Sequence, residues 1–173
     1  MSRAFVKEPD GDDRVNALPE RVHNDLPNYI TPKGLSDLEK KARQLETNIA
    51  TSKTDQSIGA RSRAELAKRN LRYLRERVRR AISTEPPKSP TSVQFGVTVK
   101  LLANDDSTYQ FTLVGEDETD IETGHISWAS PIGRLLVGRK IGDELIWPRG
   151  DINLKVEIIG LWSPHKNRIR HPQ

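Results

Sequence analysis

The sequence contains no cysteine, which excludes disulfide bonds, zinc sites built on thiolates and a thiol nucleophile. Aromatic residues make up only 5% and hydrophobic residues only 34% of the chain, so a single large core is not expected. No apolar run approaches the roughly 18 residues that would span a bilayer. Residues 1–8 lack the apolar segment of a secretory signal. These absences predict a soluble cytoplasmic protein with no membrane partner.

Catalytic patterns are also scarce. The four histidines are scattered along the chain, at positions 23, 125, 165 and 171. His125 lies in a predicted strand beside a turn, where a hydrogen-bonded structural role is favoured over that of a base or metal ligand. Asp117, Glu118 and Asp120 lack the regular ligand spacing of a calcium loop, so a solvated turn is favoured over a cation site. No glycine-rich phosphate-binding loop occurs. The sequence therefore predicts neither an enzyme nor a resident metal or cofactor.

Proline and apolar patterning divide the chain into segments. We predict a disordered arm (1–30), an antiparallel helical hairpin (31–84), a linker with prolines 86, 87 and 90 (85–92), a small β-rich domain (93–163) and a basic tail (164–173). Three prolines within five residues cannot continue a helix, and they favour extended chain. Two small domains therefore fit the chain better than one.

Heptad spacing supports the hairpin. Apolar residues at 35, 38, 42, 45 and 49 follow one another at intervals of three and four, and those at 64, 67, 71, 74, 78 and 81 repeat the pattern. A polar break at 50–59 separates the two segments. Two such seams joined by a short break predict an antiparallel coiled coil within one chain, hence a monomer.

Strand-like runs follow the linker at 93–101, 108–114, 121–128, 144–147 and 152–161. Between the third and fourth runs, Ser130 suits a helix N-cap and Pro131 suits the first helical position. This predicts an α+β fold in which an antiparallel sheet carries one short helix. Trp128, just before this corner, fits either sheet packing or an exposed anchor for a partner.

Basic residues are concentrated between 61 and 80. This segment contains nine basic residues and only two acidic ones, Glu65 and Glu76, so its net charge is +7. Such a segment attracts phosphates or an acidic protein surface, although a simply solvated helix face remains open. The side chains that we expect to face a nucleic acid or an acidic channel are Arg61, Arg63, Lys68, Arg69, Arg72 and Arg75.

The order of motifs resembles a known family. Phe95-Gly96-Val97, Val114-Gly115-x-Asp117-Glu118, Ile126-Ser127-x-x-Ser130-Pro131-Ile132-Gly133-Arg134-x-Leu136 and Gly142-Asp143 follow a helical hairpin and a proline-rich linker. This series resembles the GreA/GreB transcript-cleavage factors, which are bacterial transcription elongation factors, across about residues 30–162. The Arg72-Tyr73-Leu74 segment is similar to the second hairpin helix of the family, especially in its GreB branch.

The resemblance implies an FKBP-like C-terminal domain that docks on the rim of the RNA polymerase secondary channel, with the hairpin projecting into the channel. The docking surface of the family corresponds here to Ser127, Trp128, Ser130, Pro131 and Arg134. In cleaving members an Asp-x-x-Glu-Asn tip helps to hold a second Mg²⁺ at the polymerase active site, so the factor itself is not an enzyme. Two-metal phosphoryl chemistry needs such hard oxygen ligands.

The tip departs from that pattern. Asp55 matches the first acid, but Ile58 replaces the second. The hairpin is also shorter than in cleaving members by about two helical turns per arm, or roughly 10 Å of reach. Both departures predict weak stimulation of cleavage, as in the short-hairpin Rnk-type relatives.

Two other functions remain open at this point. The basic helix at 61–80 could bind DNA or nascent RNA directly, which predicts a steep salt dependence without polymerase. An FKBP-like sheet also suggests a peptidyl-prolyl isomerase, by analogy of fold alone. The low aromatic content argues against the aromatic-lined proline pocket of an isomerase.

Overall fold

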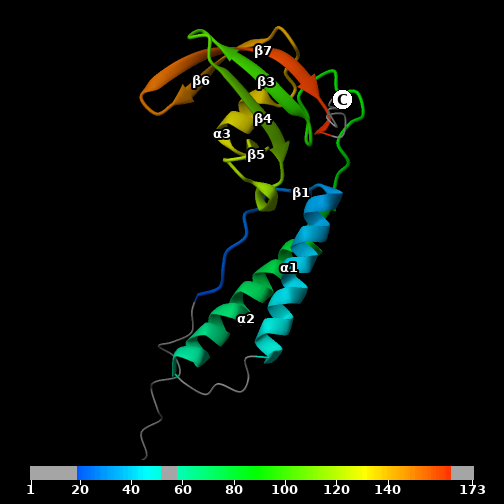
Figure 1. The fold of residues 1–173 in the computed structure, drawn as a ribbon, viewed down its shortest axis with the longest axis vertical. Helices are drawn as coiled ribbons and strands as arrows, with labels where there is room; N and C mark the ends of the chain where they lie inside the picture. Colours follow the sequence, from blue (N-terminus) through cyan, green and yellow to red (C-terminus); the bar gives the residue numbers. More distant parts are fainter. Residues whose placement is uncertain (1–18, 52–57, 165–173) are drawn as a thin grey trace, which may run out of the picture.

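A computed structural model describes residues 19–51 and 58–164 of the chain, without the side chains of residues 58, 59 and 61. Two long helices form a hairpin that extends away from a curled sheet domain (Figure 1). The prediction of an α+β fold is confirmed, with helices first and the sheet after them. Within the described residues, no helix is long and apolar enough to cross a membrane.

The hairpin consists of α1 (Pro32–Thr51) and α2 (Ile58–Arg79). Thr31 caps α1, because its hydroxyl oxygen accepts a hydrogen bond from the Gly34 N–H (3.0 Å) and Pro32 follows at the first helical position. The predicted seam residues Leu38, Ala42 and Leu71 are buried. Their burial holds the two helices together along one apolar stripe.

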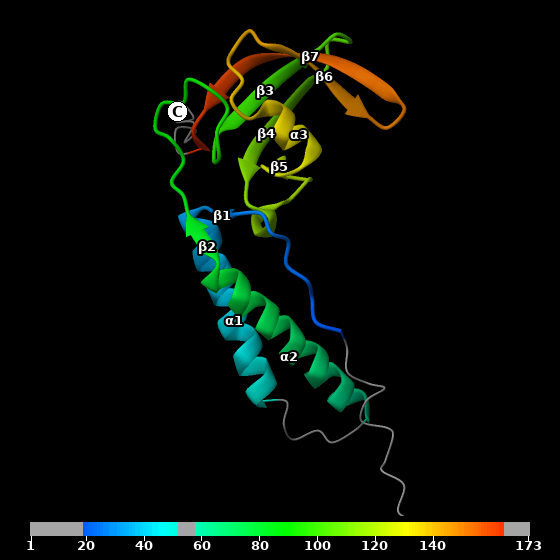
Figure 2. The ribbon, with the colours of Figure 1, turned by 180° about the vertical axis from the view of Figure 1, so that it is seen from behind.

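Two short strands lie at the base of the hairpin. β1 (Asn28–Ile30) pairs in parallel with β2 (Ala81–Ser83), so the chain enters α1 and leaves α2 side by side (Figure 2). The prediction of a disordered arm is therefore wrong for residues 28–30, since Asn28 and Ile30 are buried and pair with β2. Ala81, predicted as the end of the helical seam, lies in β2 instead.

The sheet has the strand order β5–β4–β3–β7–β6, with β3 (Thr98–Ala103), β4 (Thr108–Val114), β5 (His125–Ser127), β6 (Glu144–Arg149) and β7 (Ile152–Trp162). All neighbouring pairs in this sheet are antiparallel except β4 and β5, so the predicted antiparallel sheet contains one parallel pair at its edge. The short helix α3 (Pro131–Leu136) packs on the sheet and contributes Leu136, which is fully buried, to the core.

Two predicted strands are shorter in the structure. β3 begins at Thr98, since the Val97 N–H donates to the Gln94 carbonyl and closes a turn before it. β5 begins at His125, because residues 121–124 form a turn closed by the hydrogen bond from the Gly124 N–H to the Ile121 carbonyl. In both cases a turn occupies the start of the predicted run, and the paired strand begins after it.

Candidate functional site

Arg77 links the hairpin to the sheet domain. Its side chain is 4% exposed, and it forms ion pairs with Asp117 (2.8 Å) and Glu116 (3.3 Å) of η2 (Glu116–Glu118), a short 3-10 helix after β4. The Arg77 carbonyl also accepts a hydrogen bond from the buried Asn28 side chain (2.8 Å). Buried charges need such partners. The acidic turn, which we predicted to be solvated, is therefore a fixed contact between the two domains.

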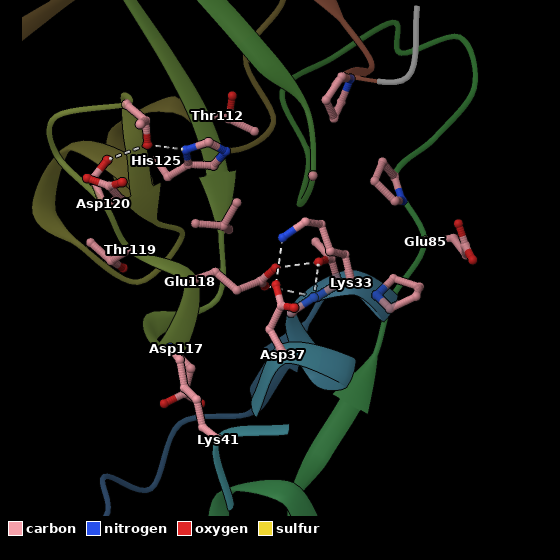
Figure 3. A pocket seen from close by; sticks show the side chains of 18 residues that line it. Lys33, Asp37, Lys41, Glu85, Thr112, Asp117, Glu118, Thr119, Asp120 and His125 are labelled. Carbon is pink, nitrogen blue, oxygen red and sulfur yellow. Dashed lines mark hydrogen bonds and ion pairs between the residues drawn. The ribbon is translucent and has the colours of Figure 1, made fainter. Parts of the chain in front are cut away.

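Glu118 completes this contact at the first turn of α1. It accepts hydrogen bonds from the Thr31 N–H (2.9 Å) and from the Thr31 hydroxyl, where a carboxylate is favoured by the helix dipole. Figure 3 shows its carboxylate directed at this turn, beside Lys33 and Asp37. The backbones approach so closely that a Cβ at Gly115 would lie 2.2 Å from the Tyr29 carbonyl oxygen. We call the contacts of Arg77 and Glu118 the interdomain latch.

Sequence reasoning did not identify Arg77, Thr31 or Glu118 as a unit. The available indication was charge, because an acidic turn at 116–118 occurs in the same chain as a helix of strongly positive net charge.

Trp128 lies at the same interface. Its ring packs edge-on against Tyr29 of β1, with ring centroids 5.4 Å apart, and Tyr29 also contacts Phe95 at 5.9 Å. Trp128 is half-buried, so the interpretation as an exposed anchor is not supported, and its described role is packing between the domains.

The turn from β5 into α3 forms a corner, residues 127–134, that contains all five predicted docking residues. The Ser130 hydroxyl donates to the Ser127 carbonyl (2.7 Å) and accepts from the Gly133 N–H (3.1 Å). The predicted N-cap is thus confirmed. Pro131 and Arg134 are exposed on the outer side of the same corner. The serines hold the shape of the corner, and Pro131 and Arg134 are its accessible side chains.

A cleft of about 690 Å³ lies between the first turn of α1 and strands β4 and β5 (Figure 3). Two of its charged groups are paired with each other: Lys33 donates to Asp37 (2.6 Å), and this hydrogen bond and the charge of Lys33 lower the pKa of Asp37. His125 is hydrogen-bonded through Nδ1 to the Thr123 hydroxyl (2.7 Å), as predicted for a structural histidine. Within 19–51 and 58–164, no cluster of three or more acidic or histidine side chains is arranged to hold a metal ion.

The predicted basic residues lie along α2, and most of them form ion pairs or hydrogen bonds with other residues of the chain. Lys68 pairs with Glu65 (2.8 Å), Arg75 with Glu46 of α1 (2.7 Å) and Arg72 with Glu20 (Nε to Oε1, 3.0 Å). Arg69 donates to the Pro19 carbonyl (3.4 Å). Arg63 is exposed, and the side chain of Arg61 is not among those that the structure describes. Three of the six predicted basic residues are therefore paired with acids, of which Glu20 and Glu46 come from other segments and Glu65 from α2 itself.

The predicted tip acid, Asp55, lies outside the described residues, and Ile58 is described only as the first residue of α2. In the sheet domain, Tyr109, Phe111 and Trp147 come together, with Trp147 edge-on to the other two rings at 5.2 and 5.6 Å. These rings pack on the hydrophobic core and on one another.

Comparison with known proteins gives the family. The family model described as "Transcription elongation factor, GreA/GreB, C-term" matches residues 87–163. GreB of Neisseria meningitidis serogroup B is 31% identical over 152 residues, which cover 78% of this chain and 93% of that protein. GreA of Rhodospirillum rubrum is 32% identical over 135 residues, or 67% of this chain and 85% of that protein.

Solved structures of similar chains include a GreA/GreB factor from Nitrosomonas europaea, 24% identical, with a TM-score of 0.40 over 78% of this chain and 98% of that chain. Gfh1 from Thermus aquaticus is 18% identical, with a TM-score of 0.41 over 78% of this chain and 97% of that chain. The identity to GreB over nearly its whole length, together with the family model, carries the assignment. The chain belongs to the GreA/GreB family of transcription elongation factors.

Proposed function

We propose that this protein regulates transcription elongation by docking on RNA polymerase at the rim of the secondary channel. The observation that carries the proposal is the corner at 127–134, which lies within the segment matched by the family model and presents Pro131 and Arg134 on a capped, fixed turn. In this proposal the sheet domain binds the rim and the hairpin enters the channel. Trp128 acts indirectly, by fixing the corner against Tyr29.

The interdomain latch supports the proposal that the hairpin enters the channel. A hairpin that enters a channel must keep its direction relative to the domain that docks. Two ion pairs and the Glu118 contact join α1 and α2 to η2 of the sheet domain. Because α1 has 20 residues, the hairpin extends roughly 30 Å from this contact.

We further propose that the protein stimulates transcript cleavage weakly and acts mainly by occupying the channel. The tip contains Asp55 but has Ile58 where cleaving members have the second acid. A single carboxylate holds a second Mg²⁺ poorly, because Mg²⁺ prefers several hard oxygen ligands. Any Mg²⁺ would belong to the polymerase active site. We expect a monomer, since each helix finds its apolar partner within the hairpin.

The test combines binding and cleavage on backtracked elongation complexes from the cognate polymerase. Arg134→Gln should weaken polymerase binding by about threefold to tenfold, as expected for an exposed interface charge. Lys155→Gln, which removes the same charge from β7, serves as the matched control and should bind like the wild type. Equal binding by both variants and the wild type would refute the docking assignment.

Cleavage is read in the same samples. Bound factor without cleavage supports a channel occupant, whereas cleavage that is lost in Asp55→Ala would identify a working single-acid tip and contradict the weak-cleavage proposal. If polymerase is not bound at all, the alternative is direct binding of nucleic acid by helix 61–80. That alternative predicts affinity for DNA or RNA alone, falling steeply with salt.

A further inference from the structure

Residues 19–27 lie along α2 before the chain enters β1 (Figures 1 and 2), and we call this segment the strap. Its first contacts are polar. The Pro19 carbonyl accepts from Arg69 (3.4 Å), and Glu20 forms an ion pair with Arg72 (Nε to Oε1, 3.0 Å). A carbonyl and a carboxylate of the strap thus occupy two arginines of α2.

The middle of the strap covers an aromatic ring. The Arg21 guanidinium lies 3.8 Å from the centroid of the Tyr73 ring, and the His23 imidazole stacks on Tyr73 at 4.5 Å with the planes 4° apart. Further along, Arg80 donates to the Asn24 carbonyl (3.0 Å), and the Asn24 amide donates to Glu116 (2.5 Å). The strap therefore connects the α2 face to the sheet domain.

The covered face has the chemistry of a single-stranded nucleic-acid site. Arg69, Arg72, Tyr73 and Arg80 recur at intervals of three, one and seven residues, which places them on one side of a helix. Arginines bind phosphates, and an exposed aromatic ring offers a stacking surface for any base. The strap fills two of these positions with groups that resemble those of a nucleic acid, a carboxylate at Arg72 and a planar ring on Tyr73, and it places backbone carbonyls at Arg69 and Arg80.

The contacts between the strap and α2 are weak enough for another ligand to displace the strap. The Arg72–Glu20 pair has side chains that are 55% and 61% exposed, and exposed ion pairs contribute little to stability. Arg69 Nε on α2 is a buried donor without a hydrogen-bond partner beneath the strap, which weakens the contact further. A phosphate that accepts a hydrogen bond from this donor can therefore compete with the strap.

We propose that the strap is an autoinhibitory segment that covers a single-stranded nucleic-acid-binding face formed by Arg69, Arg72, Tyr73 and Arg80. The strap and the nucleic acid compete for this face, so binding requires the strap to leave it. The proposal does not depend on polymerase docking, because it concerns nucleic acid bound by the chain alone.

The first experiment compares two charge-matched variants of the full chain. Glu20→Gln removes the strap carboxylate from Arg72, and Glu65→Gln removes the same charge from a residue that pairs with Lys68 and also interacts electrostatically with Arg72. Binding of a fluorescent 12-nucleotide oligouridine RNA is measured by anisotropy at low salt. Glu20→Gln should bind about two- to fivefold more tightly than Glu65→Gln, the gain expected from releasing one exposed ion pair.

The second experiment follows the strap itself. The chain has no cysteine and Val22 is 90% exposed, so a spin label at Val22→Cys reports on the strap without competing sites. Addition of the RNA should increase the mobility of the label in its paramagnetic resonance spectrum. Equal RNA affinities of the two glutamine variants, or an unchanged spectrum while RNA is bound, would overturn the proposal.

Discussion

Replacing Arg77 with methionine should separate the unfolding of the hairpin from that of the sheet domain. Methionine retains much of the aliphatic bulk of arginine but removes both ion pairs to η2. Asp117, whose side chain is 15% exposed, then lacks its cation in a site from which water is largely excluded. The hairpin loses its strongest polar link to the sheet domain.

The loss of folding free energy in Arg77→Met can be estimated from the burial of Arg77 and of its two acidic partners. Removing one partner of a buried ion pair costs about 3–5 kcal/mol. Because the side chain of Glu116 is 38% exposed and water can solvate it, we place the cost near the lower bound, at about 3 kcal/mol. With a urea dependence of about 1 kcal/mol/M for a segment of this size, the midpoint for loss of the hairpin falls by about 3 M.

The chain provides separate probes for its two parts. All three tryptophans, at 128, 147 and 162, lie in the sheet domain, and of these Trp128 also contacts Tyr29 at the base of the hairpin. The long helices α1 and α2 form the hairpin and dominate the signal in circular dichroism. Urea titrations followed by circular dichroism at 222 nm and by tryptophan fluorescence should coincide in the wild type and diverge in Arg77→Met. Arg79→Met is the control, since within residues 19–51 and 58–164 Arg79 pairs only with Glu76 on the surface of the same helix, and its loss should cost less than about 1 kcal/mol. Coincident curves at the wild-type midpoint in Arg77→Met would refute the latch.

Three smaller perturbations test neighbouring features. Gly115→Ala places a methyl group against the Tyr29 carbonyl and should cost about 1–3 kcal/mol of folding free energy in thermal unfolding, so an unchanged melting temperature would contradict the close approach. Ser130→Ala removes the cap of α3 and should cost about 1 kcal/mol in urea unfolding, whereas no loss would mean that the cap hydrogen bond is not stabilising. The Lys33 hydrogen bond and charge lower the pKa of Asp37, so its stabilising effect is present above the ordinary carboxyl pKa and is lost as the pH falls through the lowered value. Lys33→Met should raise the pKa of Asp37 in an NMR titration, and no change would refute the pairing.

Features determined by neighbouring residues could be predicted from the sequence. The cap of α3 depends on Ser130, Pro131 and Gly133, which lie within four residues, so its geometry follows from local chemistry. The apolar seam of the hairpin could also be predicted, because its buried residues, Leu38 and Ala42 in α1 and Leu71 in α2, belong to runs of apolar residues at helical spacing.

The interdomain latch could not be predicted from neighbouring residues. Glu118 binds Thr31 from 87 residues away, and Arg77 binds Asp117 from 40 residues away. Local reasoning therefore interpreted the acidic turn as solvated and kept Trp128 as a candidate anchor, although its ring packs against Tyr29. Contacts of this kind depend on how the domains meet, and a local pattern does not contain that information.

The hairpin and the latch together act as a lever with a short, charged pivot. With roughly 30 Å between Thr31 and the far end of α1, a rotation of about 5° at the pivot displaces the far end by roughly 3 Å. Misplacement of a reacting group by about 1 Å can already cost a large factor in rate. The contacts of Arg77 and Glu118 at the base therefore limit how far the end of α1 at Thr51 can move relative to the sheet domain.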